Sequence, residues 1–172
     1  MRKVILAAAS AVIFGVLSTA GSSPAYALGK VVSAGTKVCG GAYVTRGNGE
    51  IVNTTYNLRN TNSLRTILIT RVQSFNGSGT SMYDSSVSGL PGGMLNILPK
   101  NGGTRFNASD VTPGGAPISS ADLPMQVRVD YRILGGNDGG IMRMGGTVSL
   151  TDPLGNTLSR HNANCNETPQ LY

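Results

Sequence analysis

The sequence predicts an all-β protein, folded as a single antiparallel β-sandwich of roughly seven to nine short strands. Three observations predict this class. Apolar and polar residues alternate with a period of two in several segments, which indicates strands with one buried face, and helical periodicity does not recur. Turns rich in Gly, Asn and Pro separate these segments. The composition is low in charge, at 13%, and high in glycine, at 24 residues, which is typical of an exported β-protein with many turns.

The chain begins with the features of a cleavable secretory signal peptide, which we expect over residues 1–27. Arg2 and Lys3 supply a basic start, an uncharged apolar run follows, and a small-x-small cleavage site ends at Ala27. The run is shorter than the roughly 20 apolar residues of a membrane-spanning helix. We therefore expect a mature protein that starts at Leu28 and is extracytoplasmic: periplasmic, secreted or on the cell surface. The alternative is an uncleaved N-terminal anchor.

The mature chain has the length of one domain. Removing 27 residues from 172 leaves 145, which is enough for one hydrophobic core. We expect an N-terminal extension over 28–36, the β-sandwich domain over 37–165 and a C-terminal tail over 166–172. None of these parts contains a segment long and apolar enough for a transmembrane helix.

The distribution of the basic residues argues against nucleic acid as a partner. The whole chain has 14 basic and 8 acidic residues. Without Arg2 and Lys3 the balance becomes 12 − 8 = +4. The remaining basic residues are scattered singly, whereas a nucleic-acid interface needs clustered Lys and Arg with aromatic platforms.

The two cysteines, Cys39 and Cys165, lie near the two ends of the mature chain. In an oxidising compartment such a pair predicts one disulfide. It would close a loop of 165 − 39 = 126 residues. A reactive or metal-binding thiol pair is the alternative, but neither cysteine belongs to a CxxC motif and His161 is the only histidine.

The N-terminal half of the domain holds five candidate strands. Val52, Tyr56 and Leu58 fall on one face of the second of them and form its predicted apolar side. In Thr66–Val72 the apolar set changes phase, which indicates a central strand or a bulge near Arg71. The candidate strands are 37–46, 50–59, 64–75, 80–84 and 103–107.

The C-terminal half contains the clearest alternation. In 125–133 the odd positions are apolar and predicted inward, and 141–150 shows a similar pattern. The glycine-rich segment 135–140 is predicted to join these two strands as a hairpin. A turn at 152–156 precedes a last strand at 157–160.

Two irregular segments are the candidate binding regions. Residues 108–124 contain three prolines and no alternation, so we expect a long surface loop. The tip 135–140 is rich in glycine. Loops on a rigid scaffold are a common place for binding contacts. The candidate binding residues are Asp110, Thr112, Asp122, Asn137 and Asp138.

No residue pattern predicts catalysis. A hydrolase needs a nucleophile, a base and an orienting group, and His161 with Ser159 lacks an obvious acid partner. Most acidic residues fall in turns. Asp130 lies in a strand between Arg128 and Arg132, where a solvent-side ion pair is the simplest interpretation.

No cofactor and no metal site are predicted. Asn137-Asp138-Gly139 is loosely calcium-like but lacks the series of oxygen ligands found in an EF-hand. Met142 and Met144 could suggest copper because thioethers are soft ligands. Two methionines on the inward face of a strand are more often core residues.

Three pieces of sequence carry a resemblance. They are Leu58-Arg59-Asn60-Thr61-Asn62 running into Thr66–Val72, then Leu98-Pro99-Lys100-Asn101-Gly102-Gly103-Thr104-Arg105-Phe106, then Val127-Arg128-Val129-Asp130-Tyr131. In this order they resemble exported bacterial β-sandwich domains of unassigned activity. More remotely, they are similar to the β-sandwich of the sensory-rhodopsin transducer type. The resemblance covers about 51–150 and implies the fold, with no catalytic residue to carry over.

We therefore expect a non-catalytic binding or accessory module whose partner is an envelope or extracellular protein or ligand. One alternative is a structural subunit of a surface polymer, with 28–36 or 166–172 pairing with a neighbour's sheet edge. Self-association would accompany that alternative. A hydrolase that uses His161 is the remaining alternative.

Overall fold

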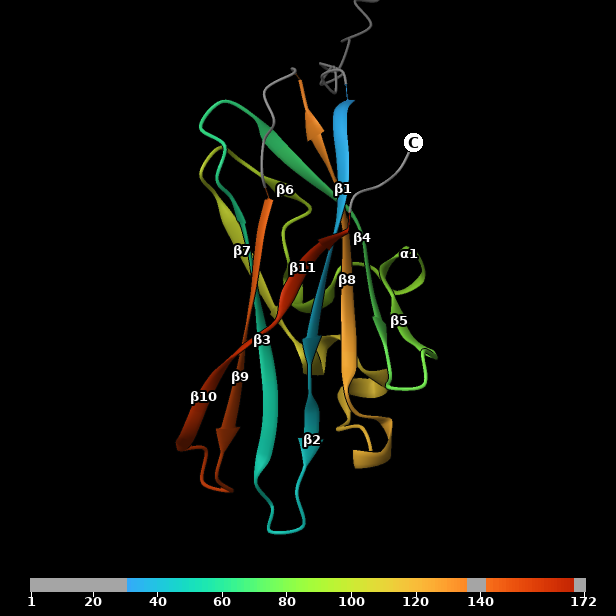
Figure 1. Cartoon of the computed structure of the whole chain (residues 1–172), viewed down its shortest axis with the longest axis vertical. Helices are drawn as coiled ribbons and strands as arrows, with labels where there is room; N and C mark the ends of the chain where they lie inside the picture. Colours follow the sequence, from blue (N-terminus) through green and yellow to red (C-terminus); the bar gives the residue numbers. More distant parts are fainter. Residues whose placement is uncertain (1–30, 136–141, 169–172) are drawn as a thin grey trace, which may run out of the picture.

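The computed structural model describes residues 31–135 and 142–168, and these residues form two antiparallel β-sheets packed face to face (Figure 1). Sheet A contains β1 (Val31–Gly41), β4 (Thr66–Phe75), β5 (Ser81–Asp84), β6 (Ile97–Leu98), β8 (Met125–Leu134) and β11 (Cys165–Thr168). Sheet B contains β2 (Tyr43–Thr45), β3 (Ile51–Asn60), β7 (Gly103–Asn107), β9 (Met142–Thr151) and β10 (Thr157–Ala163). The predicted all-β sandwich is confirmed.

Each sheet is built around long strands and finished by short ones. The order in sheet A is β11-β1-β8-β4-β5, and β6 also pairs with β4. The order in sheet B is β10-β9-β3-β2, and β7 also pairs with β3. The far edges of β4 and β3 are thus each covered by two short strands, which leaves little continuous edge there for pairing with another chain.

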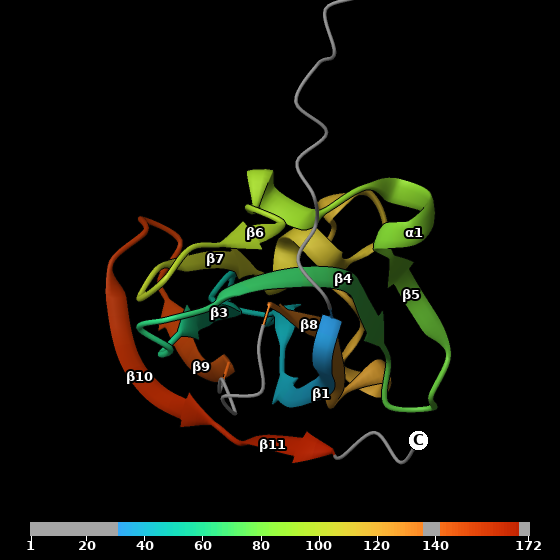
Figure 2. The same cartoon turned by 90° about the horizontal axis from the view of Figure 1, so that it is seen from above.

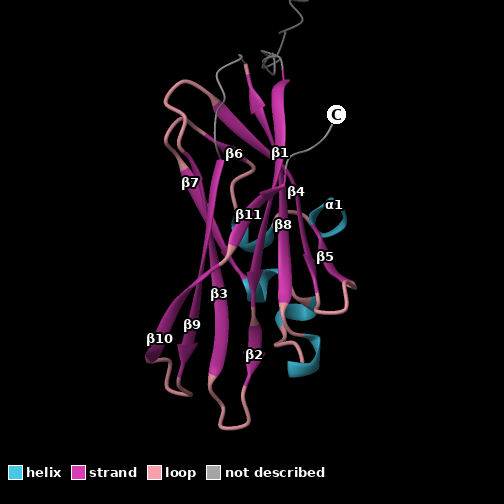
Figure 3. Ribbon diagram, in the orientation of Figure 1, coloured by secondary structure: helices cyan, strands magenta, loops and turns pink. Residues whose placement is uncertain are grey.

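In the described residues, helical structure consists of short turns; Figure 3 shows one beside β5 and others near the lower end of β8, where that strand begins. They are α1 (Ser85–Ser88) and the 3-10 turns Pro91–Gly93, Ala108–Val111, Pro113–Gly115 and Ser120–Asp122. Most of the segment 108–124, expected as a surface loop, consists of these turns. Ala108 and Val111 within it are fully buried.

The core lies between the sheets and follows the predicted alternation. On β8 the inward residues are Met125, Val127, Val129, Tyr131 and Ile133, each at most 4% exposed. On sheet B, Tyr56 and Phe106 are buried, and their ring centroids are 5.1 Å apart. This spacing is within the favourable range for aromatic pairs. Burying each such large apolar side chain stabilises the fold by about 1.5–3 kcal/mol.

Two strands pass from one sheet to the other along the same side of the sandwich. β1 is followed after Ala42 by β2, and β10 is followed after Asn164 by β11. Figure 2 shows β10 running into β11. The Gly40 amide donates to the Asn164 carbonyl at 3.0 Å, so the two crossings are bonded to each other. Such sheet-switching strands form the corners of a sandwich.

The predicted disulfide joins these crossings. Cys39 on β1 and Cys165 on β11 are bonded, and they are also directly opposite each other in the strand register. Cys39 is fully buried. Because β11 pairs with β1 at only four positions, Thr36 to Cys39, the disulfide is the covalent anchor of a short edge strand.

The bulge near Arg71 is confirmed. The register of β4 against β8 shifts between Ile69 and Arg71, so the inward set changes from Ile67 and Ile69 to Val72 and Ser74. An extra residue at this point moves every later side chain of β4 to the opposite face.

The predicted hairpin between residues 125–133 and 141–150 is wrong. β8 pairs with β1 and β4 in sheet A, whereas β9 pairs with β3 and β10 in sheet B. The chain therefore crosses between the sheets after β8. The alternation of each strand identified its buried face correctly, but alternation does not identify the neighbouring strand, and two strands whose apolar faces meet across the core have the same pattern.

The domain boundaries also differ from those expected. β1 begins at Val31, within the expected extension 28–36, and β11 ends at Thr168, within the expected tail 166–172. The start of the first strand was missed because Val31-Val32-Ser33-Ala34-Gly35 does not alternate.

Candidate ligand groove

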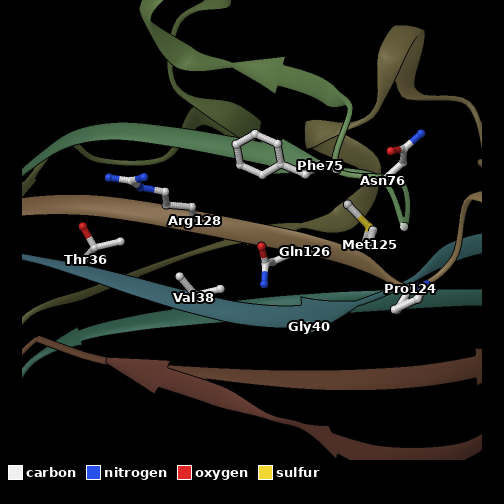
Figure 4. Close-up of a pocket in the computed structure, with 11 residues that line it drawn as sticks. Thr36, Val38, Gly40, Phe75, Asn76, Pro124, Met125, Gln126 and Arg128 are labelled. Carbon is white, nitrogen blue, oxygen red and sulfur yellow. The ribbon is translucent and has the colours of Figure 1, made fainter. Parts of the chain in front are cut away.

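A groove of about 670 Å³ lies on the outer face of sheet A, turned away from the core (Figure 4). Its floor is formed by β1, β8 and the end of β4, and one wall by the turn between β4 and β5. This volume is in the range of small-molecule sites. The lining residues are Thr36, Val38, Gly40, Phe75, Asn76, Gly77, Gly79, Pro124, Met125, Gln126 and Arg128.

The strand register arranges the outer face in rows. Across β1, β8 and β4 the rows are Gly40–Gln126–Phe75, then Val38–Arg128–Gln73, then Thr36–Asp130–Arg71. The first row combines an aromatic ring with an amide, and the third carries two charges. One end of the face is therefore suited to apolar contact and the other to polar contact.

Gly40 accounts for the hollow in the floor. A Cβ atom placed on Gly40 would have no heavy atom within 4 Å. Its neighbours across the strands, Gln126 on β8 and then Phe75 on β4, rise beside this gap (Figure 4). The space exists because one position of β1 has no side chain.

The wall of the groove is fixed by polar contacts with the segment 108–124. The Asn76 side chain donates to Asp122 Oδ1 at 3.1 Å, and the Gly77 amide donates to the Asp122 carbonyl at 2.6 Å. Asn76 Oδ1 also accepts from the Thr80 amide. These bonds hold the turn that forms the wall beside Pro124.

A half-buried carboxylate orients the cation at the polar end. Arg128 Nε donates to Asp130 Oδ1 at 3.0 Å, and the Thr36 hydroxyl donates to the same oxygen at 2.6 Å. The Asp130 side chain is 15% exposed and that of Arg128 is 42% exposed. Within the part of the chain that the structure describes, Arg128 makes no other ion pair. Its terminal nitrogens are therefore available to an acceptor group.

A second ion pair extends the polar surface toward β5. Arg71 bonds Asp84 through two nitrogens, and Gln73 donates to Asp84 at 3.1 Å. The bonds from Arg71, with the two that Ser86 donates, hold the pKa of Asp84 well below its ordinary range. The charge of Asp84 is thus balanced within the protein.

The predicted binding residues divide into two groups. Asp110 accepts from the Asn107 amide at 2.8 Å as part of a capping box, Thr112 is buried and donates to the Ser109 carbonyl, and Asp122 holds Asn76. All three therefore have bonds within the protein, and Asp122 supports the groove without lining it. The other two, Asn137 and Asp138, lie outside the described residues.

The residues considered for catalysis and metal binding are not brought together. His161 is exposed on β10 opposite Val148, and Ser159 is opposite Leu150. Within residues 31–135 and 142–168, no three His, Cys, Asp or Glu side chains gather as metal ligands would. Met142 is fully buried in the core. No helix in the same residues has the length and apolar character needed to cross a membrane.

Sequence reasoning missed the groove, although two signals of it were present. The even positions Gln126 and Arg128 were identified as outward, but an outward polar residue on a strand is ordinary. Phe75 was the stronger signal. Once the bulge at Arg71 is taken into account, its aromatic ring falls on the solvent face of β4.

Comparison with known proteins gives no relative. No protein-family model matches the chain, and neither a curated protein nor a solved structure matches it.

Proposed function

We propose that the protein is an exported, non-catalytic binding module that holds a ligand in the groove on the outer face of sheet A. The observation that carries this proposal is the hollow over Gly40, bordered by Phe75 and Gln126 and ending at Arg128. A ligand with a flat apolar part and an anionic or acceptor group matches this lining. The apolar part would lie beside Phe75, and the acceptor group would meet the guanidinium.

Binding rather than catalysis is supported by the side chains that line the groove. They are apolar, amide or guanidinium groups apart from Thr36, whose hydroxyl donates to Asp130. Asp130 is in turn paired with Arg128. A pre-oriented cation beside an apolar hollow is an arrangement for holding a ligand.

Export is supported by the bonded cysteine pair and by the N-terminal sequence. Disulfides form and persist in oxidising compartments. We expect N-terminal sequencing of the protein from fractionated cells to begin at or near Leu28, outside the cytosol. Recovery of a chain that begins at Met1 in the cytosol would contradict export.

The surface-polymer alternative has less support. The segments considered as donor strands are used within the domain: residues 31–41 pair with β8, and 165–168 pair with β1. We expect the purified protein to elute as a discrete monomer or dimer. A ladder of larger species would favour the polymer.

A probe with the proposed chemistry tests the groove. The dye 8-anilinonaphthalene-1-sulfonate combines aromatic rings with a sulfonate. We expect saturable binding at one site, measured by fluorescence titration. The variant Gly40→Leu should weaken it at least tenfold because the new side chain fills the hollow, and Arg128→Gln should weaken it severalfold.

The matched control is Gly47→Leu. Gly47 is also free of neighbours within 4 Å, has an ordinary φ and lies in the distant turn between β2 and β3. This variant should bind the dye as the parent protein does. Equal affinity in Gly40→Leu and Gly47→Leu, or no saturable binding at all, would show that the groove is not the binding site.

A further inference from the structure

Three arginines gather at one end of the outer face of sheet B, remote from the groove. Arg59 on β3 and Arg143 on β9 are directly opposite each other in the register. Arg105 on β7 lies opposite Asn57, two residues before Arg59. All three side chains are exposed. The strand register thus places three outward guanidinium groups on three adjacent strands.

No described carboxylate balances these charges. In residues 31–135 and 142–168, Arg59, Arg105 and Arg143 form no ion pair. The acidic side chains described lie elsewhere: on sheet A and β5, in the segment 108–124, and in the turns at the opposite end of sheet B. Like charges directly opposite each other on neighbouring strands are destabilising. The arrangement is therefore one that an external anion would stabilise.

Two exposed leucines lie in segments that are hydrogen-bonded to the turn and strand beside these arginines. A cavity of about 480 Å³ has Arg59, Arg105, Asn101 and Thr104 in its lining. The Leu95 amide donates to Thr104 Oγ1 at 3.3 Å, and Leu95 is 58% exposed.

Leu64, in the turn between β3 and β4, is 59% exposed. Its amide donates to Asn62 Oδ1 at 2.7 Å, and the Asn62 carbonyl accepts from the Asn101 amide at 3.2 Å. The turn that carries Leu64 is therefore bonded to the turn that lines the cavity. Cations and apolar side chains occupy one end of the molecule.

We propose that this end of the sandwich, defined by Arg59, Arg105, Arg143, Leu64 and Leu95, docks on an anionic phospholipid surface. The guanidinium groups bind lipid phosphates, since Arg matches phosphate oxygens with paired donors. The two leucines enter the boundary between headgroups and acyl chains. A soluble anion would account for the arginines, but it would leave the exposed leucines unexplained.

This docking surface is separate from the groove on sheet A. The groove lies on the opposite sheet, so a protein docked on a membrane through sheet B would keep the groove open to solvent. The two proposals can therefore fail independently.

Co-sedimentation of the exported protein with vesicles tests the docking surface. One set of vesicles contains equal parts of phosphatidylglycerol and phosphatidylcholine, and the other contains phosphatidylcholine alone. We expect binding to the first set only. Each Arg→Gln change should lower the partition coefficient about fivefold, because one basic residue near an anionic surface contributes about that factor. The triple variant of Arg59, Arg105 and Arg143 should lose on the order of a hundredfold.

The matched control changes three other exposed arginines, Arg46, Arg132 and Arg160, to Gln. It removes the same net charge from other parts of the molecule and should bind almost as the parent protein does. The double variant Leu64→Ser/Leu95→Ser should lower vesicle binding severalfold. The contribution of the leucines should remain in the parent protein at about 1 M salt, where charges are screened.

Two results would overturn the proposal. Equal losses in the two triple-arginine variants would mean that only net charge matters. Dextran sulfate serves as a soluble polyanion. If the Arg59, Arg105 and Arg143 variant loses dextran sulfate binding and the leucine changes leave vesicle binding unaffected, the arginines bind a soluble polyanion instead. Circular dichroism of each variant separates these results from unfolding.

Discussion

At the scale of single residues, neighbouring glycines on β1 have opposite roles. Gly40 lies in the floor of the groove, and a Cβ there would have no heavy atom within 4 Å. Gly41 points inward at the crossing into sheet B. A Cβ there would lie 2.0 Å from the hydroxyl oxygen of Tyr56. Tyr56 is fully buried, and burial raises the pKa of its phenol, so the ring lies against the backbone as a neutral group.

These positions predict different results for the same substitution. Gly41→Ala should lower the free energy of unfolding by about 1–3 kcal/mol, because the added methyl group overlaps the Tyr56 hydroxyl and the packed core cannot yield freely. Gly40→Ala should leave it unchanged or raise it by up to about 1 kcal/mol, because alanine reduces the entropy of the unfolded chain. Urea unfolding of both variants measures the difference. Equal effects would contradict the assigned roles.

At the scale of secondary-structure elements, the junction of β4, β5 and α1 depends on one carboxylate. Asp84 ends β5, caps α1 by accepting from the Ser86 amide at 3.0 Å, and binds Arg71 at the bulge of β4. The bulge turns Arg71 toward β5, and the Asp84 side chain connects the two strands with the helical turn. A short edge strand is thereby fixed by ionic and capping bonds.

The low pKa of Asp84 predicts an acid-sensitive junction. A carboxylate whose pKa is lower in the folded state stabilises the protein fully above its unfolded pKa of about 3.9 and loses that stabilisation as pH falls through this value toward the folded pKa. Asp84→Asn should therefore destabilise the protein at about pH 5, and its deficit should shrink toward about pH 2. Urea midpoints across this range test the prediction. A deficit that stays constant with pH would mean that the charge of Asp84 is not involved.

The elements also show what the sequence could predict. The strand candidates 50–59, 64–75, 80–84 and 103–107 match β3, β4, β5 and β7 closely because alternation and turn residues are local signals. The bulge at Arg71 was visible as a change of phase. Pairing was not visible, because it depends on contacts far apart in the sequence, such as Val31↔Leu134 and Ile51↔Thr151.

The candidate site could not be predicted from the sequence because it too depends on strand pairing. Gly40, Gln126 and Phe75 are distant in the chain and become neighbours only through the register of three strands. The segment 108–124 was chosen because it lacks alternation. The structure gives Asp110, Thr112 and Asp122 bonds that hold this segment to the sandwich, and Asp122 reaches the groove only through Asn76.

At the scale of the whole molecule, one side of the sandwich is closed by the two strand crossings. The chain passes from sheet A to sheet B between β1 and β2 and from sheet B to sheet A between β10 and β11, and these two crossings are joined by the bond from Gly40 to Asn164 and by the disulfide. Beside the second crossing, Ala163 at the end of β10 pairs with Gly146 on β9, where a Cβ would lie 2.7 Å from that of Ala163. The same side carries the floor of the groove on β1, so the closure and the groove share a strand.

This closure predicts the effect of removing the disulfide. The bond spans 126 residues of sequence, and the chain-entropy model assigns such a loop about 4–5 kcal/mol of stabilisation. Cys39→Ala/Cys165→Ala should lower the free energy of unfolding by about that amount, while the long pairings β1–β8, β4–β8 and β3–β9 preserve the fold. Urea unfolding with and without reductant measures the loss. In reductant, the free energy of unfolding of the parent protein should fall to that of the double variant. Because β11 would be held by four register positions alone, hydrogen exchange should increase first there and at the crossings. Two alkylatable thiols in the native parent protein, or equal stability of parent and double variant, would contradict this role.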